Sequence, residues 1–544
     1  MKQTKLVLIF ILVLAFFLRL VNIQNNPPAM YGDELTMALD VNSIIHTGMD
    51  ETGKFLPLNF SMGGGRPVGY GYFSIPFVFA FGTSELGIRL LSILSGVGLS
   101  LLMFFLGKKL FSEKVGLLAA GLLAINPWDM ALSRGGFETH FALFLSVLGV
   151  VLLLEAVGKR WYYLLSVLCF GLAINTYSTY KLTIPLFAPF LLWFSNFKTQ
   201  FAKENKLPII LAGLIVVLVG GLLGYQVLFA NSESRFLSIN AFSKIDLQQQ
   251  VIQKVNYDIN TSSLPLPIAK LFSNKLTEYT GILIESYFKN FSLDFLFLHG
   301  DRNPRHNMTT MGQFYLVEII TMLFGLGYLG TKSDKRVLIF LLGWLGLGPI
   351  ASTLLLETHA LRASFMIPPL ILISALGFVQ IWTIFRNKLF WVKLLVVVGF
   401  VIQFLLFSEK LYFVAPNQFG NFWSVAAKKA AETAKQNQNN FDYIILSDRI
   451  DNMEFAYPAY AQVKPELIIE QNQHRTDLMS YQFKKSGNVY IGSVPGSDLE
   501  KFISLIPGSV LYIGPQGDQI NLTNYETVNG KDKQVELVLK RKIK

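Results

Sequence analysis

The chain has 544 residues, of which 52% are hydrophobic and only 15% charged, and its formal net charge is +11. Soluble globular proteins carry about 25% charged residues, so this composition excludes an ordinary soluble protein. Repeated apolar runs of about twenty residues predict instead an α-helical polytopic membrane protein. The basic residues cluster in short loops between these runs, so membrane topology explains them better than nucleic-acid binding does.

The first apolar run predicts an uncleaved membrane span. Residues 1–20 have a basic start and an apolar body, as a signal peptide has, but no small-x-small cleavage site follows them. Lipid offers no partner for backbone N–H and C=O groups, so every span must be helical. About eleven spans are predicted: 5–23, 86–107, 115–132, 140–157, 162–179, 182–195, 207–229, 314–331, 337–356, 361–384 and 390–408.

Loop charge predicts which side each loop faces. Short basic loops between the spans fall on one side together with Lys2 and Lys5, and the positive-inside rule makes that side, and the N-terminus, cytoplasmic. These loops are 107–114, 158–160, 196–206, 331–336 and 385–388. The long loops 24–85 and 230–313, the short loop 133–139 and everything after residue 408 are then external. We expect a multi-pass protein of the cell membrane.

The tail, residues 409–544, differs in pattern from the membrane region, residues 1–408. Short apolar runs at 442–448, 466–470, 487–493 and 509–515 read as strands, and 421–436 and 497–506 read as helices. This alternation predicts a C-terminal extracytoplasmic α/β domain. Within the loop 230–313, residues 273–291 read as an amphipathic surface helix.

Two adjacent acids, Asp33 and Glu34, lie in the first external loop. The segment 34–60 that they open reads as an interfacial amphipathic helix followed by a turn. A charge held beside hydrocarbon is costly unless it is paired or hydrated, so such residues are functional candidates. The plainer interpretation is that they are ordinary solvated loop acids. For Asp50 and Glu51, which precede a glycine in a predicted turn, turn chemistry is as good an explanation as catalysis.

Four cations lie on the same predicted side, against the topological rule: Arg89, Arg134, Lys181 and Arg362. A shared anion such as a phosphate would explain them together, since arginine offers phosphate a planar fork and lysine a point charge. The alternative is that each reaches lipid headgroups or pairs locally. A carboxylate opposite a phosphate site suggests group transfer, in which the carboxylate takes the proton of an acceptor hydroxyl and the cations stabilise the leaving phosphate.

The stretches "MYGDELTMALDVNSIIHTG", "LGIRLLSILSGVGLSLLMFFLGKKLFSEKVGLLAAGLLAINPWDMALSR", "GLAINTYSTYKLTIPLFAP" and "LRASFMIPPLILISALG" resemble the GT-C superfamily of polyprenyl-phosphate-sugar-dependent glycosyltransferases. The resemblance is closest to the protein O-mannosyltransferase and aminoarabinose lipid A transferase branch. It implies that Asp33 is the catalytic base, accompanied by Glu34, and that Arg89 lies near the donor phosphate.

The same resemblance places Arg134 and Glu138 as a basic-then-acidic pair and Lys181 as a phosphate ligand. Relatives often have Asp at the position of Glu138. The stretch around Arg302, Arg305 and His306 resembles a subset of bacterial members, where these residues would touch donor or acceptor. The β-trefoil domain of the protein O-mannosyltransferases is not recognisable in this sequence.

Several residues also have plainer explanations. Tyr177 could line a sugar pocket, although tyrosine is common at membrane interfaces. His140 and His306 could bind metal, but without a compact ligand spacing structural roles are favoured and no metal site is predicted. Whether a divalent metal takes part in the reaction stays open.

The sequence therefore predicts a hexosyl- or pentosyltransferase, mannosyltransferase-like, that moves a sugar from a polyprenyl-phosphate donor to an acceptor hydroxyl with inversion. The competing interpretations are a transporter or flippase of lipid-linked sugars, which predicts polar residues within the spans, and a non-catalytic scaffold. The scaffold interpretation does not explain why the four cations lie on the same predicted side of the membrane.

Overall fold

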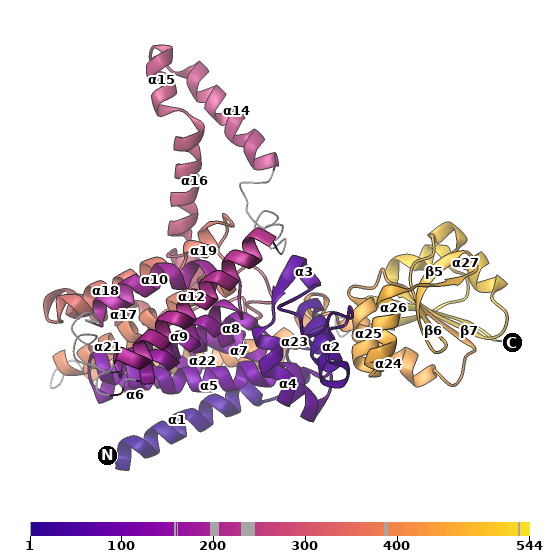
Figure 1. Cartoon of the computed structure of the whole chain (residues 1–544), viewed down its shortest axis with the longest axis horizontal. Helices are drawn as coiled ribbons and strands as arrows, with labels where there is room; N and C mark the ends of the chain where they lie inside the picture. Colours follow the sequence, from indigo (N-terminus) through magenta and orange to yellow (C-terminus); the bar gives the residue numbers. More distant parts are fainter. Residues whose placement is uncertain are drawn as a thin grey trace.

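The chain folds into a helical bundle followed by a separate sheet-containing domain (Figure 1). The computed structural model describes residues 2–156, 159, 161–195, 206–229, 245–385, 390–530 and 534–543. A long helical hairpin projects from the bundle, and the sheet domain lies at the end of the bundle that carries α2 and α3 (Figure 1).

The bundle is made of apolar helices with short helices and one small hairpin at the end that carries α2. Its long helices are α1 (Lys2–Leu20), α5 (Glu85–Leu110), α6 (Glu113–Ile125), α8 (Glu138–Leu154), α9 (Trp161–Ile174), α10 (Tyr180–Phe194), α12 (Lys206–Phe229), α17 (Glu318–Thr331), α18 (Lys335–Leu347), α21 (Ile367–Ile384) and α22 (Phe390–Glu409). The other elements are α2 (Gly32–Thr47), β1 (Asn59–Phe60), α3 (Met62–Gly65), β2 (Arg66–Pro67), α4 (Gly69–Phe81), α7 (Pro127–Arg134), α19 (Ile350–Thr353) and α20 (Ala360–Ala363).

Each of the eleven predicted spans overlaps one helix or two or three consecutive helices. Among the described residues, five helical stretches are long and apolar enough to cross a membrane, and α6 with α7, bent by 55°, would make a sixth. Shorter apolar helices such as α8 and α17 occupy the remaining positions. The protein is a multi-pass membrane protein, and the count of eleven stays a prediction. Of the basic loops, residues 158, 160, 196–205 and 386–388 lie outside the described residues.

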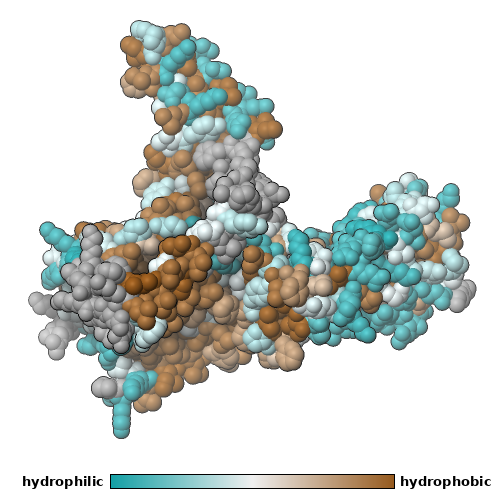
Figure 2. Space-filling view, viewed as in Figure 1, coloured by the Kyte–Doolittle hydropathy of each residue, from teal (hydrophilic) through white to brown (hydrophobic). Residues whose placement is uncertain are grey.

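The surface of the bundle is suited to lipid. Leu6, Phe10, Trp391 and Leu395 on α1 and α22 each expose more than 60% of their surface, which would be unfavourable in water. Figure 2 shows the contrast between the brown, hydrophobic bundle and the mostly hydrophilic sheet domain. An apolar belt of this kind is expected where the solvent is hydrocarbon.

Small residues let α17 and α21 approach closely. A Cβ atom added at Gly377 would lie 1.6 Å from the carbonyl oxygen of Thr321, and one added at Gly325 would lie 2.1 Å from that of Ile373. The hydroxyl groups of Thr321 and Ser374 also form a 2.8 Å hydrogen bond across the pair. Backbone contact and interhelical hydrogen bonds of this kind are what associate helices in lipid, where hydrophobic burial supplies no driving force.

The C-terminal domain contains a seven-stranded mixed sheet of order β4-β5-β6-β3-β7-β9-β8, in which β3 is parallel to both β6 and β7. Its strands are β3 (Tyr443–Leu446), β4 (Thr476–Leu478), β5 (Tyr481–Ser486), β6 (Val489–Ile491), β7 (Val510–Pro515), β8 (Glu526–Asn529) and β9 (Val535–Lys542). Its helices are α24 (Val425–Asn437), α25 (Met453–Ala461), α26 (Pro465–Gln473) and α27 (Gly496–Leu505), and α23 (Ala415–Gln418) precedes them. The expected α/β character is confirmed.

The prediction of a strand at 466–470 was wrong, because this run lies in α26. Pro465 occupies the first helical position and Glu466 the first turn, and both favour a helix start. A short apolar run alone does not distinguish a strand from a buried helix face.

The C-terminal domain packs against the first loop segment of the bundle. Lys428 forms a 2.7 Å ion pair with Glu85, Thr83 donates to the carbonyl of Ala459 at 2.7 Å, and Asn472 donates to the carbonyl of Glu51 at 2.8 Å. The predicted helix of 34–60 exists as α2, and most of its residues are buried between α4 of the bundle and α25 and α26 of the C-terminal domain.

The helical hairpin consists of α14 (Ile245–Thr261), α15 (Leu266–Phe272) and α16 (Lys275–Lys289), and it projects away from the bundle (Figure 1). A helix is present at the predicted position 273–291, as α16, but it projects from the bundle and does not lie along its surface. Leu276, Ile284 and Phe288 are exposed on it. Residues 230–244 of the same predicted loop lie outside the described part of the chain.

We expect Gly377→Ala to destabilise the bundle, because the new methyl group would force α17 away from α21. Overpacking of this kind costs about 1–3 kcal/mol. Gly327→Ala on α17 is the matched control, since a Cβ there meets nothing within 4 Å among the described residues. Thermal unfolding of the purified protein in detergent should show a lower midpoint for Gly377→Ala only; equal midpoints for the two variants would contradict this packing.

Candidate active site

The two adjacent acids at the start of α2 point into different environments. Glu34 is fully buried, and its two carboxylate oxygens each receive a 2.8 Å hydrogen bond from Arg89, one from Nε and one from Nη2. The backbone N–H of Gly136 donates to the same carboxylate at 2.7 Å. The side chain of Asp33, in contrast, is 50% exposed. Glu34 is thus enclosed in protein, and Asp33 is the acid that a substrate can reach.

Arg89 is fully committed to protein groups. Besides Glu34, it donates to the carbonyl oxygens of Ile23, Pro27 and Ala29 at 2.6–3.0 Å. A guanidinium has five N–H donors, and all five are taken. The structure therefore differs from the sequence prediction, because Arg89 has no N–H left for a donor phosphate. It anchors the segment between α1 and α2 onto α5.

Arg134 has a similar structural role. It is buried and donates to the carbonyl oxygens of Leu18, Arg19, Val21 and Asn26 at 2.7–3.0 Å. The last carbonyls of a helix lack intrahelical partners and carry the negative end of the helix dipole. Arg134 caps the end of α1 in this way, which again differs from the predicted phosphate contact.

His140 belongs to a buried network rather than to a metal site. Its Nε2 lies 2.9 Å from the carboxylate of Asp129, which is also paired with Arg19 at 2.5 Å. Its Nδ1 lies 3.1 Å from the carbonyl oxygen of Ser92. The side chains of Arg19, Asp129 and His140 are all fully buried, so the structural interpretation of His140 is the one that the geometry favours.

Asp33 and Glu138 are joined by an arginine that the sequence analysis did not single out. Arg66 Nη2 lies 2.8 Å from Asp33 Oδ1, and its Nε lies 3.1 Å from Glu138 Oε1. Arg66 also donates to the backbone carbonyl of Asp33 at 2.8 Å, and its side chain is only 4% exposed. Strand β2 holds Arg66 in place by pairing with β1. The sequence signal was one more cation in a predicted external loop.

Lys181 and Arg362 approach the same end of the bundle from other helices. Thr139, next to Glu138, donates to the carbonyl of Leu361 at 2.8 Å, which brings Arg362 beside the start of α8. Arg362 is partly buried, and its Nε has no hydrogen-bond partner within the described structure. Lys181 is half-buried in the first turn of α10, and Tyr177 lies in the turn before it.

The loop that carries Arg302, Arg305 and His306 follows the helical hairpin and packs against the residues that precede α2 and α8. Arg305 lies over the ring of Tyr31 at 5.4 Å, and the ring of His306 lies 5.9 Å from that of Phe137. Tyr31 and Phe137 precede the helices that carry Asp33 and Glu138, and their rings are 5.8 Å apart. Arg302 of the same loop is exposed. The sequence predicted that this stretch touches donor or acceptor, and that stays a prediction; the structure brings His306 against Phe137, the residue before Glu138.

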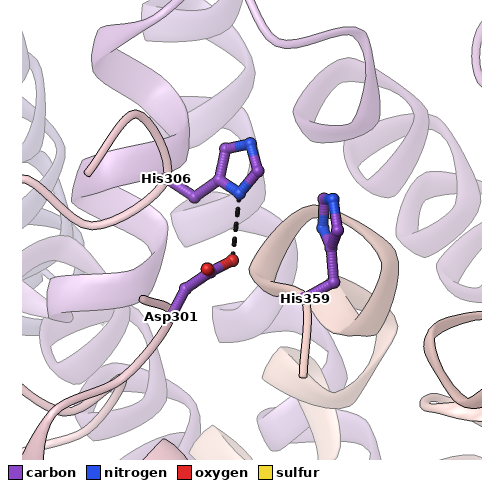
Figure 3. A group of neighbouring side chains, drawn as sticks. All are labelled: Asp301, His306 and His359. Carbon is purple, nitrogen blue, oxygen red and sulfur yellow. Dashed lines mark hydrogen bonds and ion pairs between the residues drawn. The ribbon is translucent and has the colours of Figure 1, made fainter. Parts of the chain in front are cut away.

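Asp301, His306 and His359 form a compact group in which one ligand atom from each residue lies within 4.8 Å of the others (Figure 3). The Nδ1 atom of His306 lies 3.0 Å from the Asp301 carboxylate. Burial and the neighbouring His306 lower the pKa of His359 to about 3. Burial alone would raise the pKa of Asp301, but the hydrogen bond from His306 holds it below its usual range. His359 was missed in the sequence, because it is more than 50 residues away from its two partners.

A second group of acids is formed by Asp40 of α2 and by Asp50 and Glu51 in the turn that follows this helix. Burial raises the pKa of Asp40 to about 7 and also raises that of Glu51, whose backbone N–H donates to Asp40 at 3.1 Å. Asp50 accepts hydrogen bonds from the backbone N–H groups of Thr52 and Lys54. Asp50 therefore has the turn-forming role that the sequence suggested.

A cavity of 310 Å³ between α17 and α21 does not belong to this centre. It is lined by residues near the ends of the two helices, including Tyr328, Lys332 and Gln380. The candidate site lies at their beginnings.

Comparison with known proteins supports the predicted resemblance. Residues 66–221 match the family model of dolichyl-phosphate-mannose-protein mannosyltransferase. No curated protein is similar enough in sequence to be matched. Among solved structures, ArnT from Cupriavidus metallidurans bound to undecaprenyl phosphate matches with a TM-score of 0.51 and 10% identity, over 98% of this chain and 97% of that protein. The resemblance to GT-C glycosyltransferases is confirmed, and the chain has their fold.

The archaeal oligosaccharyltransferase AglB from Archaeoglobus fulgidus, in complex with an inhibitory peptide and a dolichol-phosphate, matches with a TM-score of 0.48 and 16% identity. The match covers 84% of this chain and 63% of AglB, so the chain spans less than two thirds of the length of that protein.

We expect Arg89→Ala to destabilise the protein strongly, because it leaves Glu34 as a buried unpaired charge. Removing one partner of a buried ion pair costs about 3–5 kcal/mol. Asp33→Asn should change the unfolding midpoint little, because that carboxylate is half exposed. Chemical denaturation in detergent tests the contrast, and a similar loss of stability in both variants would contradict the division of the two acids.

We expect stability to fall as pH rises from about 4 to about 7, in part through Asp40. In this range an unfolded aspartate has already lost its proton, whereas Asp40 keeps its proton up to about pH 7 in the folded protein. The folded state then binds more protons, so its stability decreases with rising pH. Asp40→Asn should flatten the pH dependence of the unfolding midpoint between about pH 4 and about pH 7; an unchanged slope would exclude this contribution.

Proposed function

We propose that this protein is an integral membrane glycosyltransferase that transfers a sugar from a polyprenyl-phosphate donor to an acceptor hydroxyl. The reaction would occur at the extracytoplasmic face of the cell membrane and would invert the configuration of the anomeric carbon. The family match over residues 66–221 and the fold shared with ArnT support this class of reaction.

The observation that carries the proposal is the exposure of Asp33 beside an otherwise buried polar centre. Asp33 is held from one side by Arg66, which also binds Glu138, and Glu34 fixes the start of α2 through Arg89. A catalytic carboxylate must be positioned by its neighbours and yet reach the substrate. Asp33 meets both requirements.

In the proposed reaction the acceptor oxygen attacks the anomeric carbon while Asp33 takes the hydroxyl proton. The new C–O bond forms as the bond between the anomeric carbon and the phosphate oxygen breaks, and polyprenyl phosphate leaves. One base and one displacement give inversion. Negative charge develops on the departing phosphate, so nearby cations stabilise the transition state.

Lys181 and Arg362 are the proposed cations for that phosphate. The sequence assigned Arg89 and Arg134 to the same role, but the N–H groups of Arg89 are taken by carboxylate and carbonyl oxygens. Both terminal nitrogens of Arg134 donate to carbonyl oxygens, and only its fully buried Nε has no partner among the described residues. Arg362 is partly buried and retains an Nε without a hydrogen-bond partner in the described region, which a phosphate oxygen would satisfy. Tyr177 and Arg302 are proposed to contact the sugar or acceptor.

A transporter of lipid-linked sugars is the second candidate, and the placement of charge argues against it. Arg19, Arg134, His140 and Glu318 lie in the first or last turns of their helices, and Arg89 is the fifth residue of α5. Of these, Arg134 lies on the bent pair α6 and α7, but it is held by carbonyl oxygens of residues 18–26. Transport sites are expected near the middle of the membrane, at interrupted helices.

We expect Asp33→Asn to lower transfer by about 10²–10⁴-fold, the contribution usual for a general base. The assay uses protein in lipid vesicles with a panel of polyprenyl-phosphate hexoses and pentoses, and it measures release of polyprenyl phosphate. Asp246→Asn in α14 is the matched control, because this exposed acid lies on the projecting hairpin. Normal transfer by a folded Asp33→Asn protein would overturn the role of Asp33, and sugar movement without release of polyprenyl phosphate would favour the transporter.

A further inference from the structure

The Asp301–His306–His359 group joins two parts of the chain that are distant in sequence. Asp301 and His306 lie in the loop before α17, and His359 immediately precedes α20 (Figure 3). Their side chains face one another, the two imidazole rings lie 4.6 Å apart, and Asp301 and His306 are buried. The group is therefore a preformed cluster of nitrogen and oxygen donors inside the protein.

The carboxylate of Asp301 is fixed by backbone groups from both segments. Its Oδ1 accepts from the N–H of Asn303 at 2.8 Å, and its Oδ2 accepts from the N–H of Ala360 at 2.7 Å. Metal-ligating carboxylates are typically oriented by hydrogen bonds of this kind. The anchoring holds Asp301 in position whether or not an ion is bound.

His359 supplies an independent indication of a ligand. Its Nδ1 is buried and has no hydrogen-bond partner among the described residues. Leaving a buried polar atom without a partner costs about 1–3 kcal/mol, and most such atoms in folded proteins are satisfied by a neighbour, a water molecule or an ion. A metal ion bound between the three side chains would satisfy it.

The donor set selects the chemical class of the ion. Two imidazoles and one carboxylate suit zinc and related first-row transition metals, whereas magnesium and calcium prefer oxygen ligands. Bonds of about 2.1 Å in a tetrahedral site separate the ligand atoms by about 3.4 Å, so the present spacing of up to 4.8 Å requires only side-chain rotation. Arg362 acts electrostatically on His359 and would oppose the ion, and the Asp301 carboxylate has the opposite effect.

We propose that Asp301, His306 and His359 bind one divalent transition-metal ion of the zinc class. The ion would tie the loop around His306 to α20, and so fix this loop against Phe137 and the acids of the candidate active site. Three protein ligands leave at least one coordination position for water or another oxygen ligand. This site does not depend on the proposed transfer reaction, and its occupancy is measured separately from activity.

The first experiment measures metal content. The full chain, purified in detergent and stripped with a chelator, is incubated with zinc, desalted and analysed by elemental mass spectrometry. We expect about one equivalent of zinc in the wild type and at least tenfold weaker binding in His359→Ala and Asp301→Asn, as for loss of a ligand. His299→Ala is the matched control, because His299 also contacts an aspartate, Asp294, but is 72% exposed. Equal zinc loss in His299→Ala, or no zinc in the wild type, would overturn the proposal.

A second variant keeps the proposal testable where alanine prevents folding. His359→Cys retains a metal ligand, and cobalt bound to a thiolate gives an intense near-ultraviolet charge-transfer absorption that cobalt bound only by histidine and carboxylate lacks. The single native cysteine, Cys169, is buried in α9 and gives a low background. We expect this absorption in cobalt-loaded His359→Cys and not in the wild type; a folded His359→Cys protein without it would exclude His359 as a ligand.

Discussion

The buried ion pair between Glu34 and Arg89 is the interaction on which the candidate site depends. Both side chains are fully excluded from solvent, and burying two charges is unfavourable unless every donor and acceptor is satisfied. Here every N–H group of the Arg89 guanidinium donates to Glu34 or to one of three backbone carbonyls, and the backbone N–H of Gly136 donates to the Glu34 carboxylate. This ion pair thereby joins, at one point, the loop between α1 and α2, helix α2, helix α5 and the start of α8. Asp33, one residue earlier, takes its position from this junction.

The arrangement gives two neighbouring acids different tasks. In the first turn of a helix both carboxylates benefit from the helix dipole, but successive residues are about 100° apart around the axis, so the two side chains cannot share a face. One side therefore meets Arg89 in the protein interior and the other meets Arg66 beside solvent. An Asp-Glu pair is a compact way to combine an immobile anchor with an accessible carboxylate.

Sequence patterns predicted the architecture well because hydrophobic length and loop charge are local properties. The positions of the eleven helices and most of the predicted tail elements follow from runs and periodicity. The cations stood out in the sequence because their predicted side is one where few are expected, but their partners could not be predicted. Arg134 binds carbonyl oxygens of residues 18–26, and every residue has such an oxygen, so no side-chain motif records the contact. Arg66 and His359 were missed for the same reason, since only the fold brings them to Glu138 and Asp301.

The C-terminal domain contributes to the same centre rather than standing apart from it. Trp423, just before α24, is fully buried, with its ring 5.4 Å from the Arg89 guanidinium and 5.2 Å from the ring of Tyr31. A cation over an indole ring is stabilised most where water is excluded. The tail thus covers the guanidinium that fixes α2, and Tyr460 of α25 hydrogen-bonds both Met30 and Glu85 nearby. Because the buried ion pair needs this cover to stay dry, the position of Asp33 depends on the C-terminal domain as well as on the membrane helices.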